Sequence, residues 1–336
     1  MAVRVAINGF GRIGRLVLRS LIEHQRRDIE VVSINDLGPI ETNAHLLRYD
    51  STHGRFPATV EVKGDTMDVG FGPILCTAER DPAKLPHAAL GVDIAFECTG
   101  LFTAREKAAL HLAAGAKRVL ISAPGENADK TIVYGVNHEG LTADDHVVSN
   151  GSCTTNCLAP LAKVLSDLCG VERGYMTTIH SYTGDQPTLD TLHKDLYRAR
   201  AAALSMIPTS TGAAKAIGLV LPELKGKLDG SSIRVPTPNV SVVDLKVVPG
   251  REVTREEINE AFRAAALNGP LKGVLAATDE PLVSSDFNHS PASSTVALAQ
   301  TQVIDGRLAR VLSWYDNEWG FSTRMADTAL AMAKFL

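Results

Sequence analysis

The chain has 336 residues, of which 45% are hydrophobic and 21% are charged, and its formal net charge is −4. This length permits two domains with separate hydrophobic cores, and the composition is ordinary for a globular protein. The slightly negative charge provides no basic field for a polyanion, which excludes nucleic acid as the primary partner.

The sequence shows no pattern that would direct the chain to a membrane or to an oxidising compartment. No apolar run approaches the roughly 18 residues that a membrane-spanning helix needs, and the first residues lack the pattern of a signal peptide. The cysteines are few, odd in number and without the paired spacing of a metal site. They are Cys76, Cys98, Cys153, Cys157 and Cys169. We therefore expect a cytoplasmic protein with reduced thiols, no bound metal and no membrane association.

The amino-terminal segment combines a strand pattern, a glycine motif and a helix pattern. Residues 3–8 form a short apolar run, and Gly9, Gly11 and Gly14 follow at once in the pattern GxGxxG. The motif is weak alone, but a helical periodicity follows it and a second apolar run covers residues 29–34. In a dinucleotide-binding βαβ unit, such glycines permit a tight turn and let the main chain approach a pyrophosphate. The segment therefore predicts a dinucleotide-binding domain.

Asp36 follows the second apolar run, directly after Asn35. An acidic residue at this position binds the adenosine ribose hydroxyls of the cofactor. Its negative charge should also repel the additional phosphate of NADP. We therefore expect NAD as the cofactor.

Strand-like runs alternate with helical patterns, such as residues 103–114, through the first part of the chain. The strand-like runs cover residues 3–8, 29–34, 92–97, 118–121, 132–134 and 147–149. This alternation is typical of an α/β domain with a doubly wound, largely parallel sheet of the Rossmann type.

Beyond Cys153 the strand-like runs are longer and alternate between apolar and polar residues. They cover residues 171–181, 231–235, 240–248, 295–304 and 308–315. Such alternation fits a largely antiparallel sheet with one face covered. Residues 254–267 supply a covering helix, in which Thr254 and Glu257 are placed for a capping box. The pattern predicts an α+β second domain after a boundary near Gly151.

Cys153 stands between hydroxyl side chains at the start of a helical pattern, and His180 lies on a strand-like run farther along. If Ser152 caps the helix, the thiol lies at the positive end of the helix dipole, and its pKa is expected to fall below the ordinary value of about 8.5. Most free cysteines are small buried hydrophobes, and Cys157, one turn farther on, is interpreted that way. The sequence therefore predicts covalent catalysis by Cys153 with His180 as the base.

These segments together resemble the phosphorylating, NAD-dependent glyceraldehyde-3-phosphate dehydrogenase family, from Val3 to the carboxyl end. The likeness is very specific because many motifs occur in the same order. Beyond the two segments above, it is carried by NDL at 35–37, LLRYDS at 46–51, ECTG at 97–100, IPTSTGAAK at 207–215, RVPTP at 234–238 and WYDNE at 314–318. The resemblance implies oxidation of glyceraldehyde 3-phosphate to 1,3-bisphosphoglycerate, with NAD and inorganic phosphate, through a hemithioacetal and a thioester on Cys153.

The resemblance also assigns residues to the cofactor and to two phosphate pockets. The cofactor residues are Gly9, Gly11, Arg12, Ile13, Gly14, Asp36, Arg80, Ser122 and Asn317. Thr183, Asp185 and Arg234 match positions that hold the phosphate ester of the substrate, and Ser152, Thr154, Arg198, Thr211 and Gly212 match positions that hold inorganic phosphate or exchange roles during turnover. Arginine forks, hydroxyls and a helix amino terminus all suit phosphate oxygens.

The organisation implied by the family has three parts. Residues 1–151 form the NAD-binding domain, residues 152–317 form the catalytic domain, and residues 318–336 form a helix that packs back on the first domain. The family is a homotetramer. Residues 182–206, a long segment without clear periodicity, are expected to be the inter-subunit element.

Departures from the common family pattern leave alternatives open. Gly151 replaces the usual alanine, a change that should be tolerated. Thr191-Leu192 replaces a Leu-Pro pair that helps close the adenosine pocket from a neighbouring subunit, which weakens the NAD assignment slightly. Residues 286–289 also occur in erythrose-4-phosphate dehydrogenase, which oxidises a longer aldehyde and releases the acid by hydrolysis. Residues 181–186 and 314–316 favour the triose enzyme instead.

An alternative of another class is an NAD-binding, redox-sensing interaction protein. An activated cysteine is also a target of oxidation, so this alternative is chemically coherent. The loss of Cys153, His180 or the arginines would favour it, and all of them are present.

Overall fold

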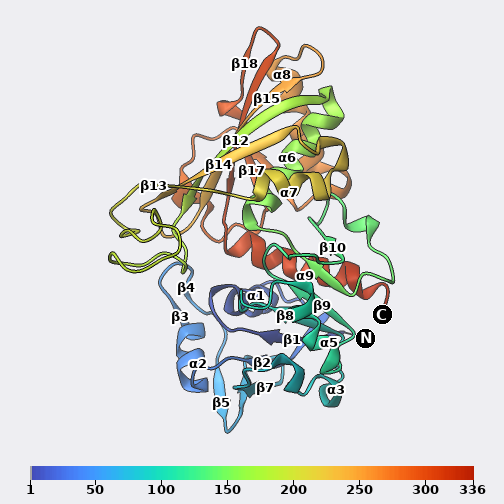
Figure 1. The fold of residues 1–336 in the computed structure, drawn as a ribbon, viewed down its shortest axis with the longest axis vertical. Coiled ribbons are helices and arrows are strands. Elements are labelled where there is room, and N and C mark those ends of the chain that lie inside the picture. The colour runs from blue at the N-terminus through green and yellow to red at the C-terminus, as the bar shows by residue number, and fades with distance from the viewer. Residues whose placement is uncertain (1) are drawn as a thin grey trace. The chain divides into compact units, whose positions relative to one another are not determined.

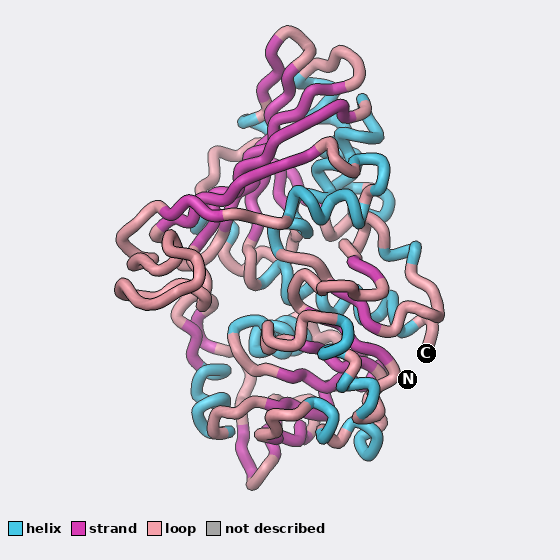
Figure 2. Tube along the Cα trace, in the orientation of Figure 1, coloured by secondary structure: helices cyan, strands magenta, loops and turns pink. Residues whose placement is uncertain are grey.

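The computed structural model describes residues 2–336 and is drawn as a ribbon in Figure 1 and as a tube in Figure 2. The chain divides into two compact units. The first contains the chain up to Ile132 together with His138–Gly151 and Ser322–Leu336, and the second contains Val133–Asn137 and Ser152–Phe321.

The first unit is built on a sheet of nine described strands in the order β10-β11-β9-β8-β1-β2-β7-β6-β5. Pairing is parallel from β10 to β7 and antiparallel among β7, β6 and β5. The strands are β1 (Val3–Asn8), β2 (Ile29–Asn35), β5 (Glu61–Lys63), β6 (Thr66–Asp68), β7 (Pro73–Thr77), β8 (Ile94–Glu97), β9 (Arg118–Ile121), β10 (Lys130–Thr131) and β11 (Val147–Ser149), and a separate pair is β3 (Tyr49–Asp50) with β4 (Gly54–Arg55). The helices are α1 (Arg12–Glu23), α2 (Ile40–Arg48), α3 (His87–Leu90), α4 (Arg105–Ala108) and α5 (Leu110–Ala113).

The central strands of this sheet are buried on both faces. Every residue of β8 and β9 is buried, as are the last four residues of β1. Such runs occur where helices cover both faces of a parallel sheet, which is the arrangement predicted from the alternating pattern. The polar ends of these strands meet at one edge, where ligands of doubly wound sheets bind.

The second unit is built on a mixed sheet in the order β13-β14-β12-β15-β19-β17-β16, with β18 paired to β19. Its pairs are antiparallel except β12 with β14 and β16 with β17. The strands are β12 (Val171–Ser181), β13 (Ile207–Thr209), β14 (Leu228–Val235), β15 (Ser241–Pro249), β16 (Leu275–Thr278), β17 (Ser294–Ala297), β18 (Gln302–Ile304) and β19 (Leu308–Tyr315). The helices are α6 (Cys153–Cys169), α7 (Ala213–Val220), α8 (Arg255–Leu267) and α9 (Trp319–Ala333), whose last part belongs to the first unit.

Helices α6, α7 and α8 pack together on the second sheet around one apolar core (Figure 1). Strand β15 alternates buried and half-buried residues after its first two positions, which fits a sheet with one covered face. The predicted capping box of α8 is confirmed, because Thr254 Oγ1 accepts from Glu257 N at 3.1 Å and Thr254 N donates to the Glu257 carboxylate at 2.8 Å. Residues 182–206 contain neither helix nor strand and are drawn as loop in Figure 2.

Some predicted bounds differ by two or three residues, as for β8 and β14, and three predicted elements differ more clearly from the structure. The helix predicted over residues 103–114 is split into α4 and α5. Near the junction Leu112 N donates to Ala109 O, only three residues back, which is the hydrogen bond of a 3-10 turn. Ala109, which joins the two helices, keeps helical torsion angles. Residues 132–134 are not a strand, and the pairing stops at Thr131. The predicted strand over residues 295–304 is interrupted by a 3-10 turn at Leu298–Gln300.

Candidate functional site

Cys153 is the first residue of α6, and the residue before it caps the helix. The Ser152 hydroxyl accepts a hydrogen bond from Thr155 N at 3.0 Å, so Ser152 serves as the N-cap. The Cys153 side chain is half-buried against the apolar core of the second unit. Helix α6 therefore places the thiol at its positive end.

His180 faces the thiol from strand β12. Its Nε2 lies 3.5 Å from Cys153 Sγ, and its Nδ1 lies 2.6 Å from the carbonyl oxygen of Ser181. Because a carbonyl oxygen can only accept, Nδ1 carries the ring proton and Nε2 presents a lone pair to the sulfur. The predicted pair of nucleophile and base is thus brought together in a tautomer that can accept the thiol proton.

The prediction of a lowered pKa for Cys153 is wrong for the folded site. Burial raises the pKa of the thiol, although the Arg234 charge and the donors of Thr154 oppose the rise. Burial, aided by the Arg234 charge, lowers the pKa of His180 to about 3. Desolvation disfavours both charged forms and outweighs the partial charge of the helix dipole. Both shifts favour the neutral forms of the two side chains, a thiol and an imidazole.

Cys157 lies one turn farther into α6 and is fully buried. Its Sγ lies 3.4 Å from Ser294 Oγ, and burial raises its pKa to about 12. This thiol stays protonated and packs in the core, in agreement with the interpretation from the sequence.

A tyrosine that the sequence analysis did not assign to the site supports the pair. The Tyr315 hydroxyl lies 2.9 Å from Thr154 Oγ1 and 2.9 Å from Thr178 Oγ1, and its ring meets the edge of His180 with centroids 5.9 Å apart. Thr178 and His180 share one face of β12 because side chains alternate along a strand. That alternation was a usable signal for Thr178, and Tyr315 lies in the WYDNE motif at 314–318, which marked the segment without giving the tyrosine a role.

Arg234 supplies a buried positive charge beside the histidine. Its Nη1 donates to the Ser181 carbonyl at 3.0 Å and to Thr183 Oγ1 at 3.3 Å, and lies 3.2 Å from His180 Nδ1. Its Nε is buried without a hydrogen-bond partner. A buried donor without a partner is costly, and an anion is the group that would satisfy it. Thr183 and Arg234 thus come together as predicted, next to the reactive pair.

The second predicted arginine is arranged differently from the expectation. Arg198 donates to the Asp185 carboxylate at 2.8 Å and to Thr209 Oγ1 at 2.9 Å. The resemblance groups Asp185 with Arg234, but in this structure Asp185 forms an ion pair with Arg198. Thr211 and Gly212 directly precede α7, and Thr211 Oγ1 accepts from Ala213 N at 3.2 Å. The helix amino terminus itself is where it was predicted.

The first unit has a cavity of about 360 Å³ at the carboxyl ends of its parallel strands. Its lining includes Asn8, Gly9, Gly11, Asn35, Asp36, Leu37, Glu79, Arg80, Cys98, Thr99, Leu101 and Phe102. Four of the predicted cofactor residues are in this set. A pocket at this edge of a doubly wound sheet is the ordinary place for a dinucleotide.

The glycine motif gives the pocket its shape. Gly9 has φ +91°, a value that side chains disfavour, and a Cβ there would lie 2.7 Å from Thr99 N. A Cβ on Gly14 would lie 2.1 Å from the Gly9 carbonyl oxygen, so only glycine lets α1 pack this closely. At Gly11 a Cβ would meet nothing within 4 Å, which leaves open space at the amino terminus of α1. That space fits a pyrophosphate.

Asp36 lies directly after β2 on the wall of the pocket. Its two carboxylate oxygens accept from Phe10 N and from Gly38 N, both at 2.8 Å. These bonds hold the glycine turn to the end of β2, while each oxygen keeps a further lone pair for ribose hydroxyls. The residues present therefore fit a nicotinamide adenine dinucleotide.

The remaining predicted cofactor residues occupy the following positions. Arg12 and Ile13 begin α1, and the Arg12 guanidinium pairs with Asp50 at 2.5 Å. Ser122 follows β9, and its N–H donates to the Glu97 carbonyl at 3.0 Å. In the second unit, Asn317 Oδ1 accepts from Ser181 Oγ and from Ser241 Oγ, both at 2.8 Å, which leaves its Nδ2 as the donor for a ligand.

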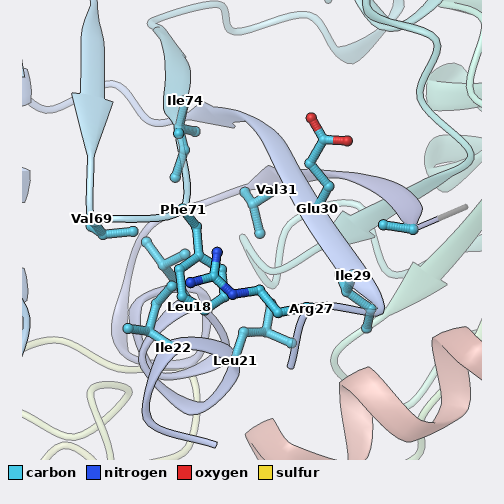
Figure 3. Close-up of a pocket in the computed structure, with 12 residues that line it drawn as sticks. Leu18, Leu21, Ile22, Arg27, Ile29, Glu30, Val31, Val69, Phe71 and Ile74 are labelled. Atoms are coloured by element: carbon cyan, nitrogen blue, oxygen red, sulfur yellow. The ribbon is translucent and has the colours of Figure 1, made fainter. Parts of the chain in front are cut away.

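A further cavity, of about 180 Å³, lies between α1, β2 and the β6–β7 segment (Figure 3). Leu18, Leu21 and Ile22 of α1 line it, as do Arg27 and Phe71, and the Arg27 guanidinium stacks on the Phe71 ring, 3.3 Å from the centroid. None of the predicted site residues lines this cavity. We therefore assign the cofactor to the pocket at the strand ends.

Across residues 2–336, no cluster of three or more histidine, cysteine or acidic side chains is placed to hold a metal ion. No helix in this part of the chain combines the length and the apolar character needed to cross a bilayer. All five cysteines are free thiols.

Comparison with known proteins decides the family. Residues 3–105 match the family model described as glyceraldehyde 3-phosphate dehydrogenase, NAD binding domain, and residues 152–317 match the model of the C-terminal domain of the same enzyme. This chain belongs to the glyceraldehyde-3-phosphate dehydrogenase family. The glyceraldehyde-3-phosphate dehydrogenase of Xanthobacter flavus is 73% identical over 334 residues, which are 99% of each chain. Those of Cereibacter sphaeroides and Geobacillus stearothermophilus are 71% identical, over the whole of both chains, and 59% identical, over 99% of each.

Family membership identifies the ligand of the strand-end pocket. The matched amino-terminal model is that of an NAD-binding domain, and the pocket lies within the matched residues. The fold predicted from the sequence, a Rossmann-type domain followed by an α+β catalytic domain, is confirmed. NAD is the cofactor, as the glycine motif and Asp36 predicted.

Proposed function

We propose that this chain oxidises glyceraldehyde 3-phosphate to 1,3-bisphosphoglycerate, with NAD and inorganic phosphate, by covalent catalysis at Cys153. The similar proteins named glyceraldehyde-3-phosphate dehydrogenase support this reaction. The observation that carries the mechanism is the distance of 3.5 Å between Cys153 Sγ and His180 Nε2. The full set of predicted residues that this chemistry needs is present.

The two reactive side chains exchange one proton in the proposed cycle. As the aldehyde arrives, the Cys153 proton passes to His180 Nε2 while the sulfur bonds to the aldehyde carbon, and the proton then goes to the new hydroxyl. The same Nε2 removes that hydroxyl proton when the carbon is oxidised to a thioester. NAD, when bound, accepts the hydride that leaves this carbon. A neutral resting pair suits this role, because the imidazole begins with a free lone pair.

The predicted phosphate residues are proposed to form two anion sites beside the thioester. Arg234 and Thr183 hold the ester phosphate of the triose, supported by the partnerless Nε of Arg234. Arg198, with Thr211 and Gly212 at the start of α7, holds the inorganic phosphate that attacks the thioester. Asp185, Ser152 and Thr154 complete these sites. Binding of a phosphate to Arg198 would compete with its present bond to Asp185.

On the cofactor side, we propose that main-chain groups of the glycine turn and of α1 bind the pyrophosphate. Asp36 binds the adenosine ribose, and Arg80 and Ser122 contact the adenine or nicotinamide regions. Asn317 Nδ2 donates to the nicotinamide carboxamide, since its Oδ1 is already occupied by two serine hydroxyls.

A homotetramer is proposed for the assembly. The loop over residues 182–206 exposes a group of large apolar side chains, which a monomer would leave in water. They are Leu189, Leu192, Leu196, Tyr197, Leu204 and Met206, with exposed fractions between 62% and 99%. We also propose a cytoplasmic location, which the five free thiols support.

The experiment that tests this function measures NADH formation with and without inorganic phosphate. Sustained turnover of glyceraldehyde 3-phosphate should require phosphate, and erythrose 4-phosphate should be a poor substrate. Arg198→Leu should mainly raise the phosphate requirement, whereas Arg234→Leu should mainly weaken binding of the triose. Rapid turnover without phosphate, together with a preference for erythrose 4-phosphate, would favour erythrose-4-phosphate dehydrogenase instead.

An NAD-binding, redox-sensing role is the alternative from another class. Burial raises the pKa of Cys153, so the resting thiol is a poorer target for oxidants than a thiolate would be. The approach of His180 Nε2 to Cys153 Sγ and the dehydrogenases among the relatives support catalysis instead.

A further inference from the structure

A buried chain of polar side chains lies beneath the NAD pocket and takes no part in the proposed chemistry. Glu97, at the carboxyl end of β8, is 1% exposed, and His111 and His87 are 0% and 1% exposed. Burying a carboxylate and two imidazoles in the core of a domain is costly unless each is hydrogen-bonded. The hydrogen-bond partners of these three side chains therefore indicate which part of the structure the buried groups stabilise.

Four donors converge on the two oxygens of Glu97. Oε1 accepts from Thr99 N at 2.8 Å and also from the Thr99 hydroxyl. Oε2 accepts from Asn8 Nδ2 at 2.6 Å and from His111 Nε2 at 3.0 Å. The other ring nitrogen of His111 lies 3.0 Å from His87 Nε2. The carboxylate thus acts only as an acceptor. His87 contacts the ring nitrogen of His111 that faces away from Glu97 and so helps to fix the orientation of this ring.

Three of these four donors come from two residues that line the NAD pocket, and a third lining residue joins through Asn8. Asn8 and Thr99 are both in the lining. Asn8 Oδ1 accepts from Nδ2 of Asn35, another lining residue, at 2.8 Å. One buried carboxylate therefore fixes side chains and main chain from the ends of three adjacent parallel strands, β8, β1 and β2. Asn8, Asn35 and Thr99 form one wall of the NAD pocket.

We propose that Glu97 is the positioning residue of the NAD pocket, and that His111, held by His87, keeps its carboxylate in place. Glu97 does not touch the cofactor in this proposal; it acts through Asn8 and Thr99. The chain supports binding of NAD and leaves the chemistry of Cys153 unaffected. Both Glu97 oxygens and both His111 ring nitrogens have partners, and the outer nitrogen of His87, Nδ1, is the one ring nitrogen of this polar chain without one. A pocket wall held by such a buried carboxylate is well ordered, which lowers the cost of ordering it when the ligand binds.

The carboxylate cannot be replaced by an amide without loss. In Glu97→Gln, one oxygen becomes an NH₂ group, which cannot accept. At the Oε1 position it would face the N–H of Thr99 and at the Oε2 position the Nδ2 of Asn8, so at least one hydrogen bond of the carboxylate is lost. We expect the dissociation constant for NAD to rise about tenfold, in line with the loss of a hydrogen bond to a charged group. The KM for NAD should rise similarly, while kcat at saturating NAD stays within about twofold.

A matched pair of variants at His111 separates positioning from bulk packing. His111→Gln keeps an N–H donor near the place of Nε2, whereas His111→Leu removes the donor and keeps an apolar side chain of similar reach. We expect His111→Leu to weaken NAD binding severalfold and His111→Gln to bind within about twofold of the wild type.

The experiment measures NAD binding by isothermal titration calorimetry on the full chain, with iodoacetamide alkylation of Cys153 in the absence of NAD as the control. The proposal predicts weaker binding in Glu97→Gln and His111→Leu, recovery in His111→Gln, and an unchanged alkylation rate in all three. Wild-type affinity in a folded Glu97→Gln would overturn it. Equal losses in the two His111 variants, or an altered alkylation rate, would show a general structural role instead. If Glu97→Gln does not fold, the His111 pair decides.

Discussion

The two binding regions of this chain are built in different ways. The NAD pocket of the first unit is formed mainly by consecutive residues at neighbouring strand ends, where glycines and main-chain groups set the shape. The reactive site of the second unit brings together side chains from elements that are far apart in the chain, including α6, β12, β14 and β19. Shape made by the main chain tolerates many side-chain changes, whereas chemistry made by side chains depends on single atoms. Variants in the two regions should therefore fail in different ways.

The largest expected effect is the loss of the nucleophile. Cys153→Ser should abolish oxidation of the aldehyde, because an alcohol of much higher pKa replaces the thiol at a buried position. Cys157→Ser is the matched control four residues along the same helix, and its turnover should stay within a few-fold. Steady-state rates of both purified variants check this. An active Cys153→Ser beside a folded but inactive Cys157→Ser would reverse the assignment.

Removal of the base should have the next largest effect. His180→Asn should lower kcat by roughly 10² to 10⁴, the usual loss for a general base. Without Nε2 as acceptor, the thiol should also ionise at higher pH. The pH dependence of iodoacetamide alkylation of Cys153 measures this shift. An unchanged profile would mean that the 3.5 Å approach has no chemical consequence.

In the first unit, the corresponding test changes selectivity and leaves the chemistry intact. The wild type should strongly prefer NAD over NADP. Asp36→Gly should narrow that preference by about 10- to 100-fold, through the loss of charge-assisted hydrogen bonds to the ribose and of the repulsion of a 2′-phosphate. Kinetics with both cofactors give the ratio. Equal efficiency of the wild type with the two cofactors would show that the Thr191-Leu192 departure outweighs Asp36.

The smallest predicted effect is on stability. Burial, with the Arg234 charge, lowers the pKa of His180 from 6.5 to about 3, so between these values the unfolded chain binds a proton that the folded chain does not. Stability from this group is complete above pH 6.5 and falls as the pH is lowered toward 3, by about 2 kcal/mol at pH 5. Urea unfolding between pH 5 and pH 8 should show a shallower pH slope for His180→Asn. An unaltered slope would contradict the neutral resting pair.

Local signals in the sequence predicted the parts of the molecule that are built locally. The bounds of β1, β9, β11, β12 and β19 agree with the runs predicted for them. The capping box at Thr254 and the turn from Gly9 to Gly14 depend on residues only a few positions apart, which a pattern can reveal. Family resemblance supplied the remaining site residues, and the structure brings Cys153 to His180 and Thr183 to Arg234.

Long-range pairing was beyond the reach of these patterns. The place of Tyr315 between Thr154 and Thr178, and of His111 against Glu97, depends on strand register and helix packing that no short motif encodes. The direction of the Cys153 pKa was wrong for the same reason. The start of α6, whose dipole would lower the pKa of the thiol, is visible in the sequence. The burial that raises this pKa is a property of the folded site.

The central claim is that Cys153 carries the oxidised substrate, and direct observation of the acyl enzyme tests it most directly. Mixing the enzyme with NAD and glyceraldehyde 3-phosphate in the absence of inorganic phosphate should give a burst of at most one NADH per site. Mass spectrometry of the quenched protein should then place a phosphoglyceroyl adduct on the peptide that contains Cys153, and added phosphate should remove it. Steady NADH formation without phosphate, or an adduct on another residue, would contradict the account.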